Sequence, residues 1–318
     1  MEKKVSILVP IYGVEKYIER CARSLFEQTY STIEYVFVND CTKDKSVDIL
    51  MKVLDDYPHR KEQFKLIHHE RNRGLAAARN TAIANMTGEY LLHVDSDDWL
   101  ELNAVKILVS KALKNNAEII LFGSKNIFVD KEKVSSIPSI SKEQYIKSIL
   151  MHSTPASIWN KFYKADFYQL SGIKSIEGID HGEDYVVVPR LVHRAKYFMV
   201  LNEPLYNYNL TNLGSYTKNI STKSIHSLLL AADELYKYFA GVEDSNIYKK
   251  EQSLLYSRTM LALIKMGDVK SYDEIYTVFK PYLNGGINQL SYLDKVIYIL
   301  LKLRMHRFLF LLIQNFKK

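Results

Sequence analysis

Over the first 122 residues, short hydrophobic runs of strand type alternate with stretches whose apolar residues recur at helical spacing. The strand-type runs cover residues 5–9, 35–38, 64–67, 89–94 and 118–122. The helical patterns cover residues 14–25, 47–54, 75–84 and 105–112. This alternation predicts an α/β fold with a mainly parallel central sheet, right-handed crossovers and flanking helices.

The rest of the chain is more helical. An extended segment is expected over residues 206–208, and helices over residues 142–151, 156–162 and 182–195. Beyond residue 221 only helical patterns remain, over residues 225–239, 254–265, 273–279 and 293–316. We therefore expect a sheet-containing domain over residues 1–220 and an α-helical C-terminal region over residues 221–318.

Polar and conformationally special residues follow the ends of four predicted strands. They occupy residues 10–13, 39–40, 68–74 and 95–98. The carboxyl ends of parallel strands meet at one edge of a sheet, and ligands bind in the crevice outside that edge. The sequence therefore predicts a binding site there.

Three carboxylates, Asp95, Asp97 and Asp98, directly follow the predicted strand over residues 89–94. Carboxylates grouped in this way repel one another, and a divalent cation that carries phosphate is a suitable partner because hard cations take oxygen ligands. The alternative is a cap for a helix that starts near residue 100. Since a cap needs one carboxylate, we expect metal or nucleotide contacts here, with Asp98 as the cap.

Composition narrows the function classes. The chain has 318 residues, which is long enough to bury a sizeable core. Its composition, 47% hydrophobic and 25% charged, is ordinary for a soluble globular protein. The net charge is +7, but no dense Lys/Arg block with interleaved aromatic residues is present, so nucleic acid is not an expected partner. Cys21 and Cys41 lack metal-ligand spacing and are expected to be free thiols in a reducing compartment. With no signal-peptide pattern and no apolar stretch of about 18 residues, the sequence favours a cytoplasmic protein.

Five segments, in order, resemble those of family 2 glycosyltransferases of the bacterial surface-polysaccharide type. They are SILVPIY at 6–12, VND at 38–40, RNRGLAAARN at 71–80, VDSDD at 94–98 and GED at 182–184. The resemblance extends over roughly the first 220 residues. It implies a GT-A fold with a Rossmann-like sheet, a nucleotide-sugar donor such as a UDP-sugar, a divalent metal (Mn²⁺ or Mg²⁺), and inversion at the anomeric carbon.

The resemblance also implies residue roles at the donor side. Asp97 would bind the metal, which stabilises the charge on the leaving nucleoside diphosphate. Asp40 would accept hydrogen bonds from the base, and a cap of the next turn is the alternative for this residue. The implied donor-binding residues are Pro10, Tyr12, Glu15, Asp40, Arg71, Arg73 and Asp95.

At the acceptor side, the resemblance implies that Asp184 is the general base. It would take the proton from a hydroxyl group whose oxygen displaces the diphosphate, and Glu183 is its local competitor. Both acids could instead be first-turn residues of a helix, favoured by the helix dipole alone. Trp159 lies in a segment similar to the acceptor side of these enzymes, and burial in the core is its alternative.

One position departs from the family pattern. After YNY at 206–208 these enzymes often carry an arginine that could hold the diphosphate, whereas this chain has Asn209. Lys218 is the nearest candidate substitute, and it would act as a point charge without the bidentate geometry of a guanidinium.

The segment 293–318 combines long apolar runs with basic residues. At 100° per residue, Lys295, Lys302, His306 and Lys317 share one helical face. One interpretation is a packed terminal helix or helix pair. The other is an amphipathic element that contacts an anionic membrane surface near a lipid-linked acceptor, which would make the protein peripheral on the inner face of the plasma membrane.

Taken together, these features predict an inverting, metal-dependent hexosyl- or N-acetylhexosaminyltransferase. It would act on a glycan or lipid-linked acceptor during surface polysaccharide assembly. The alternative is a catalytically inactive nucleotide-binding or partner-interaction module on the same fold, and the set Asp95, Asp97 and Asp184 argues against it. A processive membrane synthase is disfavoured, because the sequence has no membrane span and no Gln-x-x-Arg-Trp segment.

Overall fold

The protein forms two compact units. The structure is a computed structural model that describes residues 2–212, 220–283 and 286–317. The first unit, here the sheet unit, comprises Met1–Lys142, Ser157–Gly178 and Leu191–Asn212. The second, here the helical unit, comprises Glu143–Ala156, Ile179–Arg190 and Leu213–Lys318. This division differs from the expected single boundary near residue 220, because two earlier segments join the helical unit.

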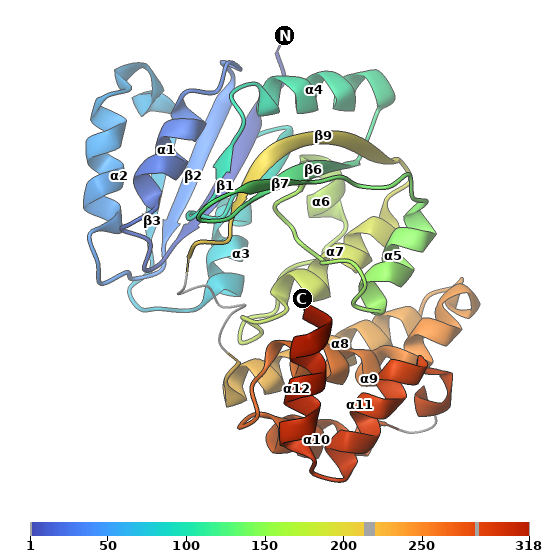
Figure 1. Cartoon of the computed structure of the whole chain (residues 1–318). Helices are drawn as coiled ribbons and strands as arrows, with labels where there is room; N and C mark the ends of the chain where they lie inside the picture. Colours follow the sequence, from blue (N-terminus) through green and yellow to red (C-terminus); the bar gives the residue numbers. More distant parts are fainter. Residues whose placement is uncertain (1, 213–219, 284–285, 318) are drawn as a thin grey trace. The chain divides into compact units, whose positions relative to one another are not determined.

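The sheet unit contains one mixed sheet of nine strands (Figure 1). Four strands form a parallel half in the order β3-β2-β1-β4, and they confirm the first four predicted strands. Their bounds are β1 Val5–Ile11, β2 Ile33–Asn39, β3 Phe64–His68 and β4 Tyr90–His93.

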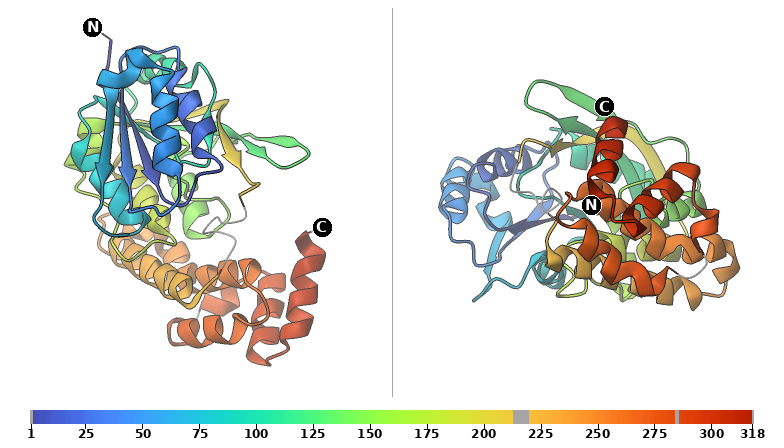
Figure 2. Two further views of the ribbon diagram at one scale, coloured as in Figure 1. Left: turned by 90° about the vertical axis from the view of Figure 1, so that its left-hand side faces the viewer. Right: turned by 60° about the horizontal axis from the view of Figure 1, so that its bottom comes forward.

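The second half of the sheet mixes strand directions. Strand β8 (Lys161–Lys164) runs antiparallel to both β4 and β6 (Ile119–Ile127), and β9 (Phe198–Asn209) is parallel to β6. The short strand β5 (Trp99–Leu100) pairs with β9, and β7 (Glu132–Ser135) extends β6 into a hairpin that projects from the sheet (Figure 2). The helix expected over residues 156–162 is therefore wrong. Hydrogen bonding to strands on both sides makes the end of that segment a strand.

Helices cover both faces of the parallel half. Alternate residues of β1, among them Val5, Ile7 and Val9, share a core with α1 (Ile18–Phe26), α2 (Ser46–Asp55) and α4 (Ala104–Asn115). The other face packs against α3 (Leu75–Asn85), whose buried alanines allow close approach to β1 and β2. Helix α6 (Ala165–Leu170) follows β8.

The helical unit is built from α5 and from five helices after residue 220. Helix α5 spans Lys142–Leu150, and α7 (Glu183–Arg194) begins in this unit. The later helices are α8 Thr222–Ala240, α9 Lys249–Met266, α10 Tyr272–Phe279, α11 Tyr292–Lys302 and α12 His306–Lys317. The early segments are tied to them by hydrogen bonds: His152 Nε2 lies 2.9 Å from Thr259 Oγ1, and His181 N donates to Ser227 Oγ (3.2 Å).

The predicted helical run over residues 293–316 is two helices. It breaks after Lys302, where Arg304 adopts a left-handed conformation with φ of +56°. The expected single face of Lys295, Lys302, His306 and Lys317 is therefore wrong, because that face requires one continuous helix. His306 instead places Nε2 3.4 Å from Asp273 Oδ1 of α10. Among the described residues, no helix is long and apolar enough to cross a membrane.

Candidate active site

Strand register places the predicted polar loops along one edge of the sheet. Ile11, Asn39 and His68 are neighbours across β1, β2 and β3, and they are the last residues of these strands. Val94 N donates to Leu8 O (3.0 Å), so the carboxylate segment leaves β4 beside the end of β1. The sheet unit therefore brings together the loops that begin at residues 12, 40, 69 and 95, as the sequence predicts.

The loop after β1 is held by hydroxyl and carboxylate groups that precede α2. Gly13 has a φ of +68°, and its N–H donates to Thr42 Oγ1 (2.9 Å). Glu15 N donates to Asp44 Oδ2 (2.9 Å), while Lys45 N donates to Glu15 Oε2 (3.1 Å). Although burial alone would raise the pKa of Asp44, hydrogen bonds from hydroxyl and backbone donors lower it.

Two predicted donor residues flank this turn in different environments. Pro10 is buried in β1 opposite Val38, whereas the Tyr12 ring is half exposed beyond the strand end. Tyr12 is thus available to a ligand at the edge, and Pro10 shapes the strand beneath it.

Asp40 organises the loop that leads into α3. Its Oδ1 accepts hydrogen bonds from Arg73 N (2.8 Å) and its Oδ2 from Gly74 N (2.8 Å). His69 Nδ1 lies 2.7 Å from Oδ1, and His69 Nε2 lies 2.9 Å from Thr81 Oγ1. The carboxylate therefore holds the start of α3, a structural role that the sequence did not predict. A carboxylate has about four acceptor positions, so a further acceptor position remains on Oδ2.

The two predicted arginines lie on the exposed loop before α3. Arg73 donates from Nη2 to Glu177 Oε1 (2.7 Å), and both side chains are exposed. Arg71 is also exposed. The loop ends at Gly74, whose φ of +90° favours glycine and lets the backbone turn into α3. Asn80 of α3 donates from Nδ2 to Ser175 O (2.8 Å) and accepts from Ser175 N at Oδ1 (3.1 Å).

A buried arginine that the sequence reading missed lies behind the carboxylates. Arg79 of α3 is 2% exposed, and its Nη2 lies 3.2 Å from Asp95 Oδ1. The neighbouring His93 is fully buried, so burial, followed by the charge of Arg79, holds the pKa of His93 well below its usual range. The position of Arg79 in the middle of the alanine-rich pattern of α3 was a signal that it is buried and needs a partner, although it does not identify Asp95 as that partner.

Asp98 is an anchor for the neighbouring strand. Its Oδ2 accepts from Tyr206 Oη (2.7 Å) and its Oδ1 from Asn209 N (2.7 Å). Helix α4 starts only at Ala104, after an N-cap at Asn103. The expectation that Asp98 caps the next helix is therefore wrong. Burial and the charges of the two adjacent aspartates raise the pKa of Asp98 well above its usual range.

Asp97 lies between Asp95 and Asp98 in the sequence, and its carboxylate accepts one hydrogen bond where that of Asp98 accepts two. Asn212 Nδ2 donates to Asp97 Oδ2 (2.8 Å), and Asn209 Nδ2 donates to the Asp97 carbonyl (3.1 Å). Burial raises the pKa of Asp97. Asn209, at the position where the family often has arginine, thus links the carboxylate segment to the end of β9. Lys218 lies outside the described residues.

The acceptor-side acids lie in the helical unit. Glu183 and Asp184 form the first turn of α7, and Gly182 O accepts the first helical hydrogen bond, from Val186 N (3.0 Å). Glu183 is buried and Asp184 is partly buried. Burial, followed by the negative charge of Asp184, raises the pKa of Tyr145 on α5.

Trp159 is a packing residue of the sheet unit. Its ring is 9% exposed and stacks on Tyr206 at 4.4 Å and on Tyr208 at 5.2 Å between ring centroids. This environment matches the core alternative, because the stacked rings leave little of Trp159 for a sugar.

Comparison with known proteins identifies the family. The family model described as "Glycosyl transferase family 2" matches residues 6–168, which is about half of the chain and includes every donor-side segment. The chain belongs to glycosyltransferase family 2. This glycosyltransferase is 31% identical over 275 residues to the glycosyltransferase GlyA of Streptococcus pneumoniae, covering 82% of this chain and 38% of GlyA. It therefore spans well under half the length of that relative.

Solved structures show the same GT-A fold. The structure of S. aureus TarS 1–349 in complex with UDP-GlcNAc superposes with a TM-score of 0.74 at 18% identity, covering 99% of this chain and 91% of that one. The mannosyltransferase PcManGT of Pyrobaculum calidifontis, in complex with GDP-Man and Mn²⁺, superposes with a TM-score of 0.54 at 14% identity, covering 96% and 86%. These likenesses place this glycosyltransferase in the GT-A fold, with further helices toward the C-terminus.

Whether the carboxylates after β4 could hold a divalent metal depends on which of their oxygens already accept hydrogen bonds. Among the described residues, no group of three or more His, Cys, Asp or Glu side chains has metal-binding geometry. Mg²⁺-type ions in phosphate sites use only one or two protein carboxylates and complete their shell with phosphates and water. Asp97, whose side chain accepts from a neutral amide, suits this role, whereas Asp98 is occupied by Tyr206 and Asn209.

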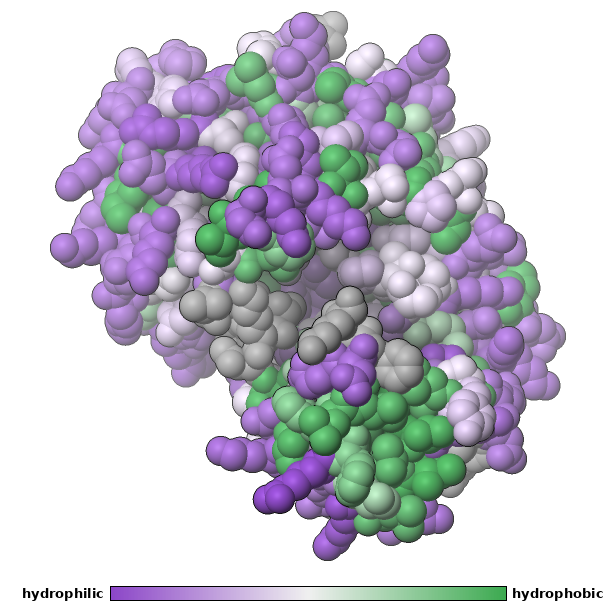
Figure 3. Space-filling model, viewed as in Figure 1, coloured by the Kyte–Doolittle hydropathy of each residue, from purple (hydrophilic) through white to green (hydrophobic). Residues whose placement is uncertain are grey.

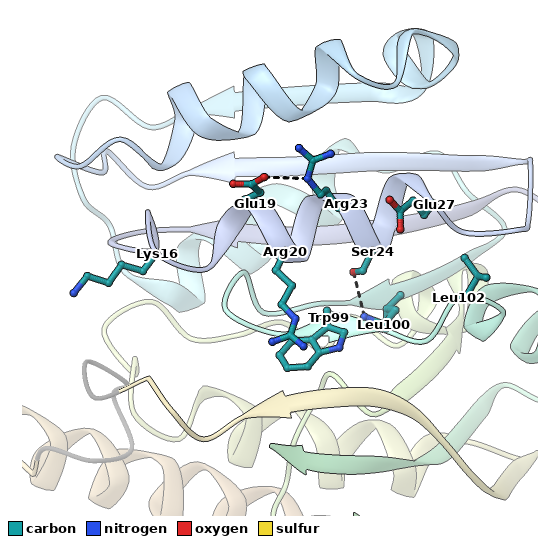
Figure 4. A pocket seen from close by; sticks show the side chains of 9 residues that line it. All are labelled: Lys16, Glu19, Arg20, Arg23, Ser24, Glu27, Trp99, Leu100 and Leu102. Atoms are coloured by element: carbon teal, nitrogen blue, oxygen red, sulfur yellow. Dashed lines mark hydrogen bonds and ion pairs between the residues drawn. The ribbon is translucent and has the colours of Figure 1, made fainter. Parts of the chain in front are cut away.

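A groove of about 560 Å³ runs between α1 and β5 of the same unit (Figure 4). Its floor includes Trp99 and Leu100, which directly follow the carboxylate segment, and Arg20 lies 3.2 Å over the Trp99 ring. Glu19 and Arg23 pair on its rim at 3.0 Å. None of the site residues predicted from the sequence lines this groove. The sequence could not indicate the groove, since Arg20 and Trp99 belong to no motif and come together only in the folded sheet unit.

Proposed function

We propose that this glycosyltransferase transfers a sugar from a UDP-sugar to a hydroxyl group of a glycan or lipid-linked acceptor, with inversion. The observation that carries the proposal is the edge of the sheet unit. There, the ion-paired Asp95 and the lightly held Asp97 lie beside the loops after β1 and β2. Partly buried acids held in this way at the carboxyl ends of parallel strands suit a nucleotide diphosphate and its metal.

The donor would lie on these loops. Tyr12 offers a half-exposed ring to the base, Asp40 has a further acceptor position, and Asp95 is 25% exposed for the ribose. Arg71 and Arg73 are exposed on a loop that Asp40 fixes, so they can meet diphosphate charge. Mn²⁺ or Mg²⁺ held by Asp97 would supply charge stabilisation for the leaving diphosphate.

The transfer itself is a single displacement. The acceptor oxygen forms a bond to C1 of the sugar while the bond from C1 to the phosphate oxygen breaks, and the electron pair leaves with UDP. We propose that Asp184 takes the acceptor proton, with Glu183 as the competing base. We propose the groove along α1 for the glycan part of the acceptor, since its volume lies in the usual range for small-ligand sites.

The first experiment is a calorimetric titration with UDP-GlcNAc, UDP-glucose and GDP-mannose in the presence of Mn²⁺ or Mg²⁺, followed by a donor-hydrolysis assay. We expect UDP-sugars to bind and to be turned over. Binding without turnover of any donor would instead support the inactive nucleotide-binding module. The choice of UDP is supported by the UDP-GlcNAc complex of TarS, the structure with the higher TM-score of the two described.

The base assignment is tested by the pair Asp184→Asn and Glu183→Gln. Asp184→Asn is expected to keep the donor dissociation constant and to lower kcat by about 10²- to 10⁴-fold, since it removes general base catalysis. Glu183→Gln serves as the matched control. A large fall in kcat for Glu183→Gln, with near-normal turnover for Asp184→Asn, would assign the base to Glu183.

Location follows from the acceptor class. A cytoplasmic enzyme that uses a lipid-linked acceptor has to meet its substrate at the inner membrane surface, and we propose that residues 293–318 make this peripheral contact.

A further inference from the structure

Exposed apolar side chains are concentrated on the last two helices of the helical unit. Of the 19 large hydrophobic side chains that are exposed in the described chain, six fall within 20 positions. They are Tyr292 (85%), Ile299 (51%), Leu303 (62%), Met305 (38%), Phe308 (64%) and Leu311 (60%). Figure 3 shows hydrophobic side chains gathered on the helical unit, where α11 and α12 lie in Figure 1. We call these six residues the terminal apolar surface.

Helical spacing places these residues on outward stripes. Tyr292, Ile299 and Leu303 follow one another at intervals of seven and four, which is one face of α11 and its extension. Phe308 and Leu311 are three positions apart on α12. Both helices are anchored by their opposite sides, because Ile297 and Leu301 of α11, and Leu309 and Ile313 of α12, are buried. The exposed stripes are therefore not needed to pack α11 and α12 against the rest of the helical unit, because other residues of both helices do so.

The two helices contact each other, so the stripes belong to one region of the helical unit. Helix α12 lies at the outer side of this unit (Figure 2). Monomeric soluble proteins rarely expose large contiguous apolar areas, and such areas mark interaction surfaces.

The exposed charged residues of the segment that carries this surface are all basic. Between residues 291 and 315 the basic residues are Lys295, Lys302, Arg304 and Arg307, and the only acid is Asp294. Asp294 is buried and pairs with Arg258 (2.7 Å) and Lys265 (3.0 Å) of α9. Lys302 and Arg307 are exposed and form no ion pair with any residue that the structure describes. Arg304 has only a distant contact, 3.8 Å to the exposed Asp273.

We propose that the terminal apolar surface inserts into the interface of an anionic lipid bilayer, with Lys302 and Arg307 on the phosphate layer. Apolar area and basic charge both contribute to this kind of binding. A second copy of the chain is the less suitable occupant, because a symmetric contact would bring the same cations face to face. The inference names the partner of the membrane contact proposed above, and it does not depend on the transfer reaction.

The test uses the purified full chain and sedimentation with two kinds of vesicle. One kind is phosphatidylcholine alone, and the other contains phosphatidylglycerol as well. We expect the protein to sediment with the anionic vesicles and to remain largely free with the neutral ones. Equal binding to both, or binding to neither, would overturn the proposal.

Two double variants separate the contributions. Phe308→Ser/Leu311→Ser removes apolar area, and Lys302→Glu/Arg307→Glu reverses charge. Each is expected to lower partitioning by at least about tenfold. The matched control is Leu113→Ser/Lys114→Glu on α4, where Leu113 is 51% exposed in the sheet unit, and it should bind vesicles like the wild type. Unchanged partitioning of both surface variants would refute the assignment.

A third variant reports insertion into the bilayer directly and does not depend on a loss of vesicle binding. Phe308→Trp should give fluorescence that brominated acyl chains in anionic vesicles quench, whereas Leu113→Trp should not. Light scattering tests the second copy: a smaller mass for Phe308→Ser/Leu311→Ser, with vesicle binding retained, would favour an oligomer and overturn the membrane proposal. Donor titration on each variant is expected to match the wild type, so failure of membrane binding and failure of the transferase function are distinguishable.

Discussion

Glu34 is the buried acid that joins the strands beneath the active edge, and its replacement by glutamine gives a quantitative test of the sheet unit. Its side chain is 2% exposed. It accepts hydrogen bonds from Ser6 Oγ (2.6 Å), Thr87 N (2.7 Å), Thr87 Oγ1 (2.9 Å) and Lys65 Nζ (2.6 Å). Glu34→Gln keeps the size of the side chain but removes the charge and turns one acceptor into a donor.

The magnitude follows from the pKa. Burial would raise the pKa of Glu34, but Lys65, Ser6 and Thr87 together lower it from 4.5 to about 2. A shift of this size corresponds to about 3 kcal/mol. Since Lys65 is 45% exposed and water screens its charge, we expect Glu34→Gln to lower the free energy of unfolding by about 2 kcal/mol at neutral pH.

The pH dependence has a definite sign. Because the pKa is lower in the folded state, the stabilisation is fully present above about pH 4.5 and is lost as the pH falls toward 2. The difference between wild type and Glu34→Gln should therefore shrink over this window, since the wild type also becomes neutral at position 34.

Denaturant titrations followed by tryptophan fluorescence measure this difference. The chain has two tryptophans, Trp99 and Trp159, and both lie in the sheet unit. Exposed Glu62, which borders the same surface groove as Glu34, provides the matched control Glu62→Gln, which should leave stability nearly unchanged. A destabilisation that stays constant from neutral pH to about pH 3 would refute the electrostatic reasoning.

Three further predictions address the site and the helical unit. Asp97→Ala should abolish the Mn²⁺-dependent part of UDP-sugar binding in calorimetry; an unchanged titration would remove Asp97 as the metal ligand. Arg79→Gln should lower the free energy of unfolding by about 2 to 3 kcal/mol, less than a fully buried pair because Asp95 is partly exposed, and should weaken UDP-sugar affinity; stability close to wild type would show that the pair is dispensable. Gly182→Ala should destabilise the protein by at least about 1 kcal/mol in circular dichroism melts, since φ is +95° and the new Cβ would lie 2.8 Å from Leu228 Cδ2; a wild-type melting curve would contradict this strain.

The alternating pattern in the first part of the chain predicted its strands and helices correctly, because the periodicity of a strand or a helix is a local property of the sequence. The four parallel strands, the helices between them and the common edge of their loops all follow from hydrophobic spacing and the crossover rule. The helix predicted over residues 156–162 is wrong because the secondary structure there depends on pairing with distant strands. The short apolar run of this segment is compatible with helix or strand, and only pairing with β4 and β6 selects the strand.

The same limit applies to side-chain roles. Asp98 looked like a local cap, but its partners Tyr206 and Asn209 come from more than 100 positions along the chain. Arg79 of α3 pairs with Asp95 after β4, and Arg20 of α1 lies over the ring of Trp99 in β5. Such pairs depend on strand order and helix placement, so no spacing rule predicts them.

The carboxylates after β4 show the division most clearly. Residue types and order lead to the prediction of donor and metal chemistry at the end of a buried strand, since acids at that place need cations or donors. Tertiary structure assigned the individual tasks: Asp95 to an arginine, Asp98 to β9, and Asp97 to a single amide that leaves it suited to a metal. It also broke the terminal helical run at Arg304, turning an expected basic face into an apolar surface flanked by cations. The reason is that burial and partner choice are set by the whole fold, whereas sequence patterns report only neighbours along the chain.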